Sequence, residues 1–403
     1  MSSDRISISI IELDFHADNL QELVDMFIMQ YEKKLKTIHL ILKKDVFSIV
    51  ESSFELYTKL TFHIFENFYS HHKCIRESLN IIQSSDIVFI NTITQNVKSF
   101  TYIDHPNLIL RIHNANRQFE PLRHLNTSLN PYNIFNLLKF LIKEVIGNQY
   151  FASIAKINKG VRYFAFPDIE IMEYALKTYK QVHTGNVMYL PLKMYKTNFD
   201  NPKKSASSKK VYLSIVGRID KNTRDVGLLY KVINGIGEET LLHPIAIRFI
   251  GCGHKNEMKK LMYNLSFIKN KMISCSVNWN NVSQSEMRKF LIESDIIVSP
   301  LKLDCVVKVI KERYGKTKVT GNFSDIAISP QPIFISAQYF NESVDLQNLN
   351  LFNNVVDLKN SLLTYINNPE LLIKKKELAK DEAMKRYGKE VIEKQLSKLK
   401  VNE

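Results

Sequence analysis

The stretch from Lys311 to Asp325 gathers side chains that suit an anionic ligand. It combines several cations with two carboxylates, Glu312 and Asp325, and it also contains two glycines. It lies between two apolar, strand-like runs and ends where a short helix is expected to begin. Backbone N–H groups at a helix start attract anions. The stretch is therefore a candidate phosphate site, with Lys318 either facing the phosphate or simply solvated.

A second basic turn opens the second half of the chain. A strand-like run delivers Gly217 and then Arg218, Lys221 and Arg224 before a helix. Cations at a strand end beside a helix start suit a pyrophosphate, because charge-assisted hydrogen bonds add to the field of the helix. A solvated basic turn is the alternative interpretation.

Two further turns follow strand-like runs in the same half. Gly251 and Gly253 end one run, and Asn281-Val282 precedes a helix that begins Ser-x-x-Glu. A lone Gly-x-Gly, with no third glycine and no acidic residue at the dinucleotide spacing, does not support an NAD site.

The order of these pieces resembles the donor-binding half of group 1 glycosyltransferases, which have the two-domain GT-B fold. The series runs Val-Gly-Arg, a second cation, strand-Gly-x-Gly, an Asn-Val turn, Ser-Asp-Ile-Ile-Val-Ser-Pro and Glu-x-Tyr-Gly. The resemblance covers about 211–340. Over 1–200 it concerns architecture alone.

The resemblance implies a role for each matching position. Arg218 and Arg224, with Lys221 as the competing second cation, would hold the donor diphosphate, and Glu312 would contact the donor sugar. The carboxylate that binds the ribose in this family is not at its usual spacing here, and Asp325 is the nearest candidate. Asp325 alternatively suits the last position of a capping box begun by Asn322. The implied nucleotide-sugar site comprises Gly217, Arg218, Lys221, Arg224, Gly251, Gly253, Asn281, Val282, Glu312, Tyr314, Gly315, Lys318, Thr320, Gly321 and Asp325.

The resemblance also implies a chemistry. Such enzymes are mostly retaining and need no metal, and the sequence shows no Asp-x-Asp pair or His/Cys cluster with metal-ligand spacing. No cofactor is expected. We expect a UDP-sugar as donor and a glycan, a lipid-linked molecule or a protein as acceptor. Arg218 and Arg224 would stabilise the departing diphosphate.

The first half offers candidates for the acceptor side. His16, close to Asp14, and His113 follow strand-like runs, where open α/β sheets bind ligands. An inverting enzyme would use one of these side chains as its base. The alternatives are an exposed turn residue for His16 and a structural histidine for His113.

Composition is that of an ordinary soluble globular protein. The 403 residues suit two domains, with 45% hydrophobic and 24% charged residues. No apolar run is long enough to span a membrane, and no secretion signal is recognisable at the start. Four scattered cysteines predict reduced thiols in a cytoplasmic protein.

The net charge of +14 is concentrated in residues 201–403, which carry +12 of it. This asymmetry leaves a basic nucleic-acid binder as an alternative, although the sequence shows no RNA-recognition, helix-turn-helix or zinc-finger signature, and we expect no nucleic-acid partner. The altered carboxylate spacing leaves a second alternative, a non-catalytic GT-B partner subunit. Lys374-Lys375-Lys376 is either a solvated face or a peripheral contact with anionic lipid on the inner face of a membrane.

Alternating strands and helices predict two Rossmann-like, doubly wound domains facing a cleft, with C-terminal helices crossing back to the first domain. The expected parts are an acceptor domain, a linker, a donor domain and terminal helices, over 1–194, 195–210, 211–368 and 369–403. Within the first domain, strands are expected at 37–42 and 46–50 and a helix near 54–69.

Overall fold

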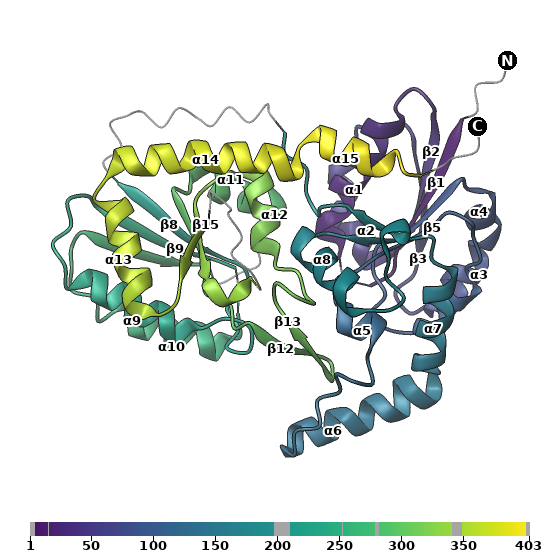
Figure 1. Cartoon of the computed structure of the whole chain (residues 1–403), viewed down its shortest axis with the longest axis horizontal. Helices are drawn as coiled ribbons and strands as arrows, with labels where there is room; N and C mark the ends of the chain where they lie inside the picture. The colour runs from purple at the N-terminus through teal and green to yellow at the C-terminus, as the bar shows by residue number, and fades with distance from the viewer. Residues whose placement is uncertain are drawn as a thin grey trace. The chain divides into compact units, whose positions relative to one another are not determined.

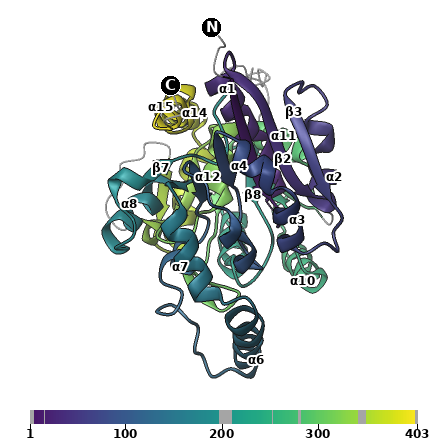
Figure 2. The same cartoon turned by 90° about the vertical axis from the view of Figure 1, so that its right-hand side faces the viewer.

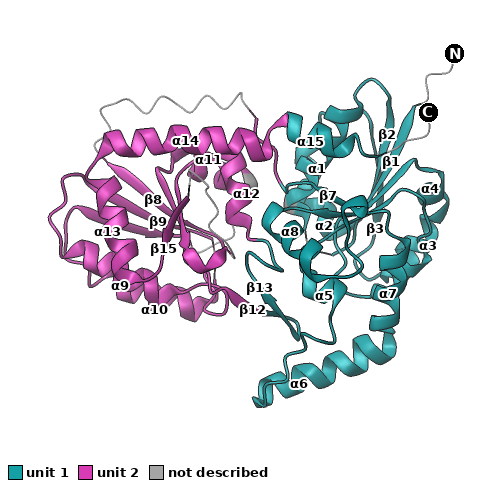
Figure 3. Cartoon of the chain, viewed as in Figure 1, with its two compact units in different colours: residues 1–192, 306–319, 390–403 teal, residues 193–305, 320–389 magenta. Residues whose placement is uncertain are grey.

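The structure of the chain is a computed structural model. It describes residues 5–14, 16–196, 210–251, 253–278, 282–340 and 349–399. The chain divides into two compact units (Figure 3). Unit 1 comprises residues 1–192, 306–319 and 390–403, and unit 2 comprises residues 193–305 and 320–389. The predicted linker lies largely outside the described residues.

Unit 1 is built on a seven-stranded parallel sheet of order β3-β2-β1-β4-β5-β6-β7 (Figure 1). Its strands are β1 (Ile6–Glu12), β2 (Leu35–Lys43), β3 (Leu60–Phe65), β4 (Ile87–Ile90), β5 (Leu108–Arg111), β6 (Tyr163–Phe166) and β7 (Val187–Tyr189). β4, β5 and β6 are buried along their whole length, as expected of a parallel sheet covered by helices on both faces.

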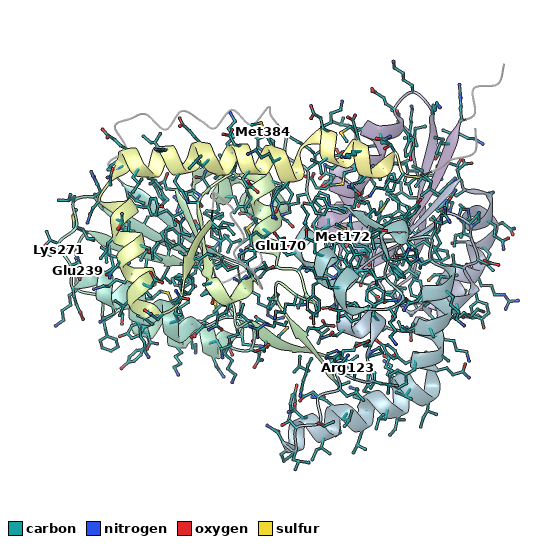
Figure 4. The ribbon with its side chains drawn as sticks, in the orientation of Figure 1. Arg123, Glu170, Met172, Glu239, Lys271 and Met384 are labelled. Carbon is teal, nitrogen blue, oxygen red and sulfur yellow. The ribbon has the colours of Figure 1, made fainter. Side chains whose placement is uncertain are left out.

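The helices of unit 1 alternate with these strands. They are α1 (Leu20–Tyr31), α2 (Lys44–Val50), α3 (His71–Glu77), α4 (Leu79–Ser84), α5 (Ala115–Phe119), α6 (Pro131–Phe140), α7 (Tyr150–Gly160) and α8 (Ile169–Thr178), with a π-helix at Leu141–Gly147. Short 3₁₀ turns lie at Ala17–Asn19, Glu51–Ser53, Val97–Tyr102 and Thr184–Asn186. The start of α8 shows how the sequence sets a boundary. Asp168 accepts the N–H groups of Glu170 and Ile171, and Glu170 (labelled in Figure 4) adds a negative charge to the first turn.

Unit 2 has a six-stranded parallel sheet of order β10-β9-β8-β11-β14-β15. Its strands are β8 (Val211–Val216), β9 (Ile245–Ile250), β10 (Ile273–Val277), β11 (Ile296–Ser299), β14 (Ile333–Ser336) and β15 (Leu349–Phe352). Its helices are α9 (Val226–Gly237), α10 (Lys255–Leu265), α11 (Gln284–Glu293), α12 (Gly321–Ile328), α13 (Val355–Ile366) and α14 (Pro369–Tyr387), with a 3₁₀ turn at Ala337–Tyr339. Both sheets therefore have the doubly wound order that the alternating pattern predicted.

The end of the chain joins unit 1, which confirms the predicted return of the C-terminal helices. α14 belongs to unit 2, whereas α15 (Lys389–Leu396) lies almost wholly in unit 1. Tyr31 donates its hydroxyl to the carbonyl of Leu396, and Tyr163 donates to that of Lys398.

Some expected elements were wrong. Residues 46–50 form the end of α2, because Val46 and Val50 are buried one helical turn apart; their β-branched side chains had favoured a strand. A helix was expected near 54–69, but this region contains the half-buried strand β3 instead. The hairpin of β12 (Asp304–Val307) and β13 (Ile310–Arg313) was not foreseen, and its tip delivers Val309 and Ile310 to the core of unit 1.

Candidate functional site

Three glycines of unit 2 meet where β8 and β9 end. Gly217 and Gly251 have φ angles of +105° and +142°, which side-chain-bearing residues rarely adopt. A Cβ on Gly251 would collide with the carbonyl of Gly217, and one on Gly253 with the carbonyl of Ile219. These positions need glycine because two backbone segments touch there.

This close approach predicts the cost of substitution. Gly251→Ala should lower the free energy of unfolding by about 1–3 kcal/mol, because it combines a strained φ with a backbone collision. Urea unfolding of the whole chain measures this loss. Gly321→Ala is the control in the same unit, because a Cβ at Gly321 meets nothing within 4 Å. Equal stability of the two variants would show that the glycine contact carries no constraint.

Arg224 lies beside these glycines at the point where the strand order of unit 2 reverses. β8 pairs with β9 on one side and with β11 on the other, so the ends of β8 and β11 flank the switch point. The guanidinium of Arg224 contacts Gly217, and its Nη1 donates to Oδ1 of Asn322 at 3.0 Å. Ser299, the last residue of β11, donates to the same oxygen at 2.8 Å.

The start of α12 completes this group. Thr320 is the N-cap, its side chain accepting the N–H of Asn322, and Gly321 opens the helix. Asn322 is 3% exposed and also donates to the carbonyl of Val216 at 3.2 Å. Asn322 thereby fixes both Arg224 and the end of β8 to the helix start. The spacing to Asp325 predicted only a capping role for Asn322. Instead, its side-chain amide links Arg224 to the end of β8, and Thr320 is the N-cap.

The other predicted donor residues of unit 2 lie nearby or at the periphery. Arg218 is exposed, with Nη2 3.4 Å from Nε2 of His254, and Lys221 is exposed as well. The carboxylate of Asp325 forms a 2.9 Å ion pair with Lys193. Val282 is half-buried ahead of α11, whereas Asn281 lies outside the described residues.

Glu312 belongs to unit 1 and is 2% exposed. Its carboxylate accepts the backbone N–H groups of Arg117 at 2.9 Å and Asn116 at 3.4 Å, in the first turn of α5. Burial raises its pKa to about 7, against the opposing effect of hydrogen bonds from Thr317 and the backbone. Glu312 is therefore held rigidly at a helix start and ionises near neutral pH.

The residues after Glu312 continue along the same unit. Tyr314 is buried, and Gly315 takes a φ of +81° in the turn that follows β13. Lys318 donates to Oδ1 of Asn114 at 3.0 Å and lies over the ring of Tyr314. The predicted phosphate-side stretch is thus divided, because Val319 ends the segment in unit 1 and Thr320 begins the next segment of unit 2.

The two predicted acceptor-side histidines come together in unit 1. The rings of His16 and His113 stack with centroids 4.3 Å apart. Nε2 of His113 lies 3.1 Å from the carbonyl of Asn91 and must carry the proton, because a carbonyl only accepts; Nδ1 is then the lone-pair atom. Burial, then His16 and Arg111, hold the pKa of His113 well below its usual range. His113 is therefore neutral at pH 7, because burial and the neighbouring cationic groups disfavour its protonated form.

A buried polar network that the sequence did not reveal lies beneath these histidines. Glu12, at the end of β1, accepts from Nδ2 of Asn91 at 2.7 Å, and Arg111 donates to Oδ1 of Asn91 at 2.8 Å. Burial raises the pKa of Glu12 to about 7. These residues occupy the ends of β1, β4 and β5 at the switch point of unit 1. Glu12 and Arg111, charged side chains within apolar strand runs, were the available signal.

The side chain of Asp14 contacts neighbouring residues of unit 1. It accepts the N–H of Thr94 at 2.7 Å, and its other oxygen lies 3.6 Å from Nε2 of the fully buried His71. A cavity of about 20 Å³, enough for one water molecule, lies next to Thr94, Arg111, His113 and Arg117.

The structure also bears on the predicted lipid-contact lysines, on metal binding and on membrane-spanning helices. Lys376 pairs with Asp295, and Lys375 donates to the carbonyl of Leu349, so two lysines of the predicted lipid-contact cluster have protein partners. Among the described residues, no group of three or more His, Cys, Asp or Glu side chains is placed to hold a metal ion. No helix in the described part of the chain combines the length and apolarity needed to span a bilayer.

Comparisons with known proteins identify the fold. No protein-family model and no curated protein matches the chain. Similar solved structures include HepE from Anabaena in complex with UDP and glucose, with 11% identity, 98% of each chain covered and a TM-score of 0.58. A glycosyltransferase from Rickettsia africae has 11% identity, 98% coverage of both chains and a TM-score of 0.61. Sucrose-phosphate synthase from Thermosynechococcus elongatus has 9% identity, the same coverage and a TM-score of 0.57. With its two doubly wound parallel sheets, the chain has the GT-B fold.

Proposed function

We propose that this chain is a glycosyltransferase that moves a sugar from a nucleotide-sugar donor, bound by unit 2, to an acceptor bound by unit 1. The observation that carries the proposal is the group formed by Arg224, Asn322 and the start of α12 at the switch point of unit 2. It would offer a diphosphate a fixed guanidinium and the positive end of the α12 helix dipole.

Arg224 and the start of α12 would stabilise the departing nucleoside diphosphate without a metal. Arg224 is already oriented by Asn322, so little reorganisation accompanies the growth of negative charge on the diphosphate. Arg218 lies on the exposed turn before it and adds a second cation. The cavity beside Gly217, Arg224 and Pro300 is only about 10 Å³, so the diphosphate would lie on the open surface of this edge.

A UDP-sugar is the donor we favour, because HepE, which shares the fold, was crystallised with UDP and glucose. The family resemblance assigns Glu312 to the donor sugar and implies retention of configuration. A neutral His113 beside His16 would suit the acceptor hydroxyl, or would serve as the base of an inverting reaction.

One observation favours a second candidate, a nucleotide-sugar-binding subunit without turnover. Both oxygens of Glu312 already accept backbone N–H groups of α5, which is what a purely structural carboxylate would do. Such a chain would bind the donor and leave it intact.

Titration with nucleotide sugars tests the proposal. A ligand that binds only the folded chain raises its stability by RT ln(1 + [L]/Kd), so its Tm rises with ligand concentration. Release of nucleoside diphosphate on adding an acceptor then separates a transferase from a binding subunit.

A further inference from the structure

The outward face of α6 and of the π-helix that continues it is apolar. Five large side chains on this face, 53 to 73% exposed, are Tyr132, Phe135, Leu138, Ile142 and Ile146. They recur every three or four residues and therefore form one stripe along the helix. The stripe is roughly 20 Å long at 1.5 Å per residue. We call these five residues the α6 stripe.

The α6 stripe is not the face that holds the helix to unit 1. Phe140 is buried in the core of unit 1, and Leu137 and Val145 pack against that core from the opposite face. Figures 1 and 2 show α6 beyond the end of α7, away from the sheet of unit 1. A helix that is apolar on both faces normally has both faces covered. The helix therefore packs on unit 1 through one face, while the α6 stripe on the other face is a large exposed apolar surface.

The charges around the stripe have one sign. Lys139 and Lys143 are exposed and lie one turn apart on the same side of the helix as the stripe. The one acidic side chain of α6 and the π-helix, Glu144, is 4% exposed and pairs with Lys308 at 3.3 Å. Arg123 (labelled in Figure 4), which precedes α6, is paired with Glu120. The exposed face therefore combines apolar and aromatic side chains with two lysines.

We propose that the α6 stripe docks unit 1 onto the surface of a bilayer that contains anionic phospholipids. An apolar helical face that includes aromatic residues enters the boundary between head groups and acyl chains, and adjacent lysines attract anionic head groups. The charge of the face selects this partner. A second copy of the chain would bring its own Lys139 and Lys143 against these lysines, whereas an anionic bilayer complements them. The inference does not depend on glycosyl transfer.

Sedimentation of the whole chain with lipid vesicles tests this docking. Wild-type chain should bind vesicles of phosphatidylcholine mixed with phosphatidylglycerol and bind pure phosphatidylcholine more weakly. The double variant Phe135→Gln with Ile142→Gln should lower binding about tenfold or more by removing apolar burial. Lys139→Gln and Lys143→Gln should each lower binding to the anionic vesicles about fivefold, and raised salt should remove this difference.

The matched control is Leu56→Gln with Phe68→Gln. These side chains are also strongly exposed in unit 1 but belong to the segments on either side of β3, so vesicle binding should stay at the wild-type level. Failure of the wild-type chain to sediment with anionic vesicles would overturn the proposal. So would an equal loss of binding in the control variant. A self-association that the Phe135/Ile142 variant abolishes, without any vesicle binding, would assign the stripe to a second copy instead.

Discussion

Glu312→Gln is expected to reduce sugar-transfer turnover by about 100-fold or more while leaving nucleoside-diphosphate affinity nearly unchanged. The reason is that the substitution removes the charge proposed to lie beside the donor sugar. It also replaces one of the two oxygens that accept backbone N–H groups of α5 with an amide NH2, so the stability of the variant is measured alongside its turnover. Steady-state turnover and calorimetric titration with the nucleoside diphosphate measure the two effects. Glu120→Gln is the control, because it removes a carboxylate from the same unit at the surface pair with Arg123.

The pH dependence separates a catalytic Glu312 from a structural one. Burial raises the pKa of Glu312 to about 7, so wild-type turnover should rise as the carboxylate ionises through that pH, and the Gln variant should lack this step. Stability should change in the opposite direction. Because the folded-state pKa lies above the ordinary value of 4.5, ionisation between these two pH values lowers the free energy of unfolding. A variant with altered stability but unchanged turnover would make Glu312 purely structural and favour the non-catalytic subunit.

Arg224→Ala should weaken nucleoside-diphosphate binding by about 1.5–3 kcal/mol, the usual contribution of a hydrogen bond to a charged group. That loss corresponds to a Kd increase of roughly 10- to 150-fold. Arg224 has this effect because Asn322 holds its guanidinium beside Gly217 at the switch point. Calorimetric titration of the whole chain measures the change.

Lys231→Ala provides the comparison for Arg224. Lys231 is an exposed cation on α9 of the same unit, so its removal changes the net charge without touching the proposed site. Equal weakening by the two variants would reduce the role of Arg224 to general electrostatic attraction. Unchanged affinity in Arg224→Ala would remove it from the site.

Much of the fold could be predicted because apolar periodicity decides it locally. The runs that became β4, β8 and β11 are buried strands with continuous or nearly continuous apolar residues, and β1 alternates before it becomes apolar. The errors fall where burial is partial or the pattern is short. β3 is only half-buried, and each strand of the β12–β13 hairpin has only four residues, so neither produced a clear period.

The candidate site could be predicted only in part, because its assembly depends on contacts between distant positions. Spacing identified Gly217, Arg224 and Gly251, since a glycine or cation after a strand leaves a local signal. Asn322 has no such signal, and its role appears only when the ends of β8 and β11 meet α12. The grouping of Glu312 with α5 of unit 1 likewise results from pairing across almost 200 residues of chain.

A thermal titration of the whole chain with nucleotide sugars and with nucleic acid separates a donor-binding protein from a nucleic-acid binder. We expect a UDP-sugar to raise Tm in a concentration-dependent way, more than GDP-, ADP- or CMP-sugars do, because binding adds RT ln(1 + [L]/Kd) to the stability of the folded chain. Arg224→Ala should shift this response to higher concentration. No response to any nucleotide sugar, together with salt-sensitive stabilisation by DNA or RNA, would rule out nucleotide-sugar binding by this chain and favour the nucleic-acid binder.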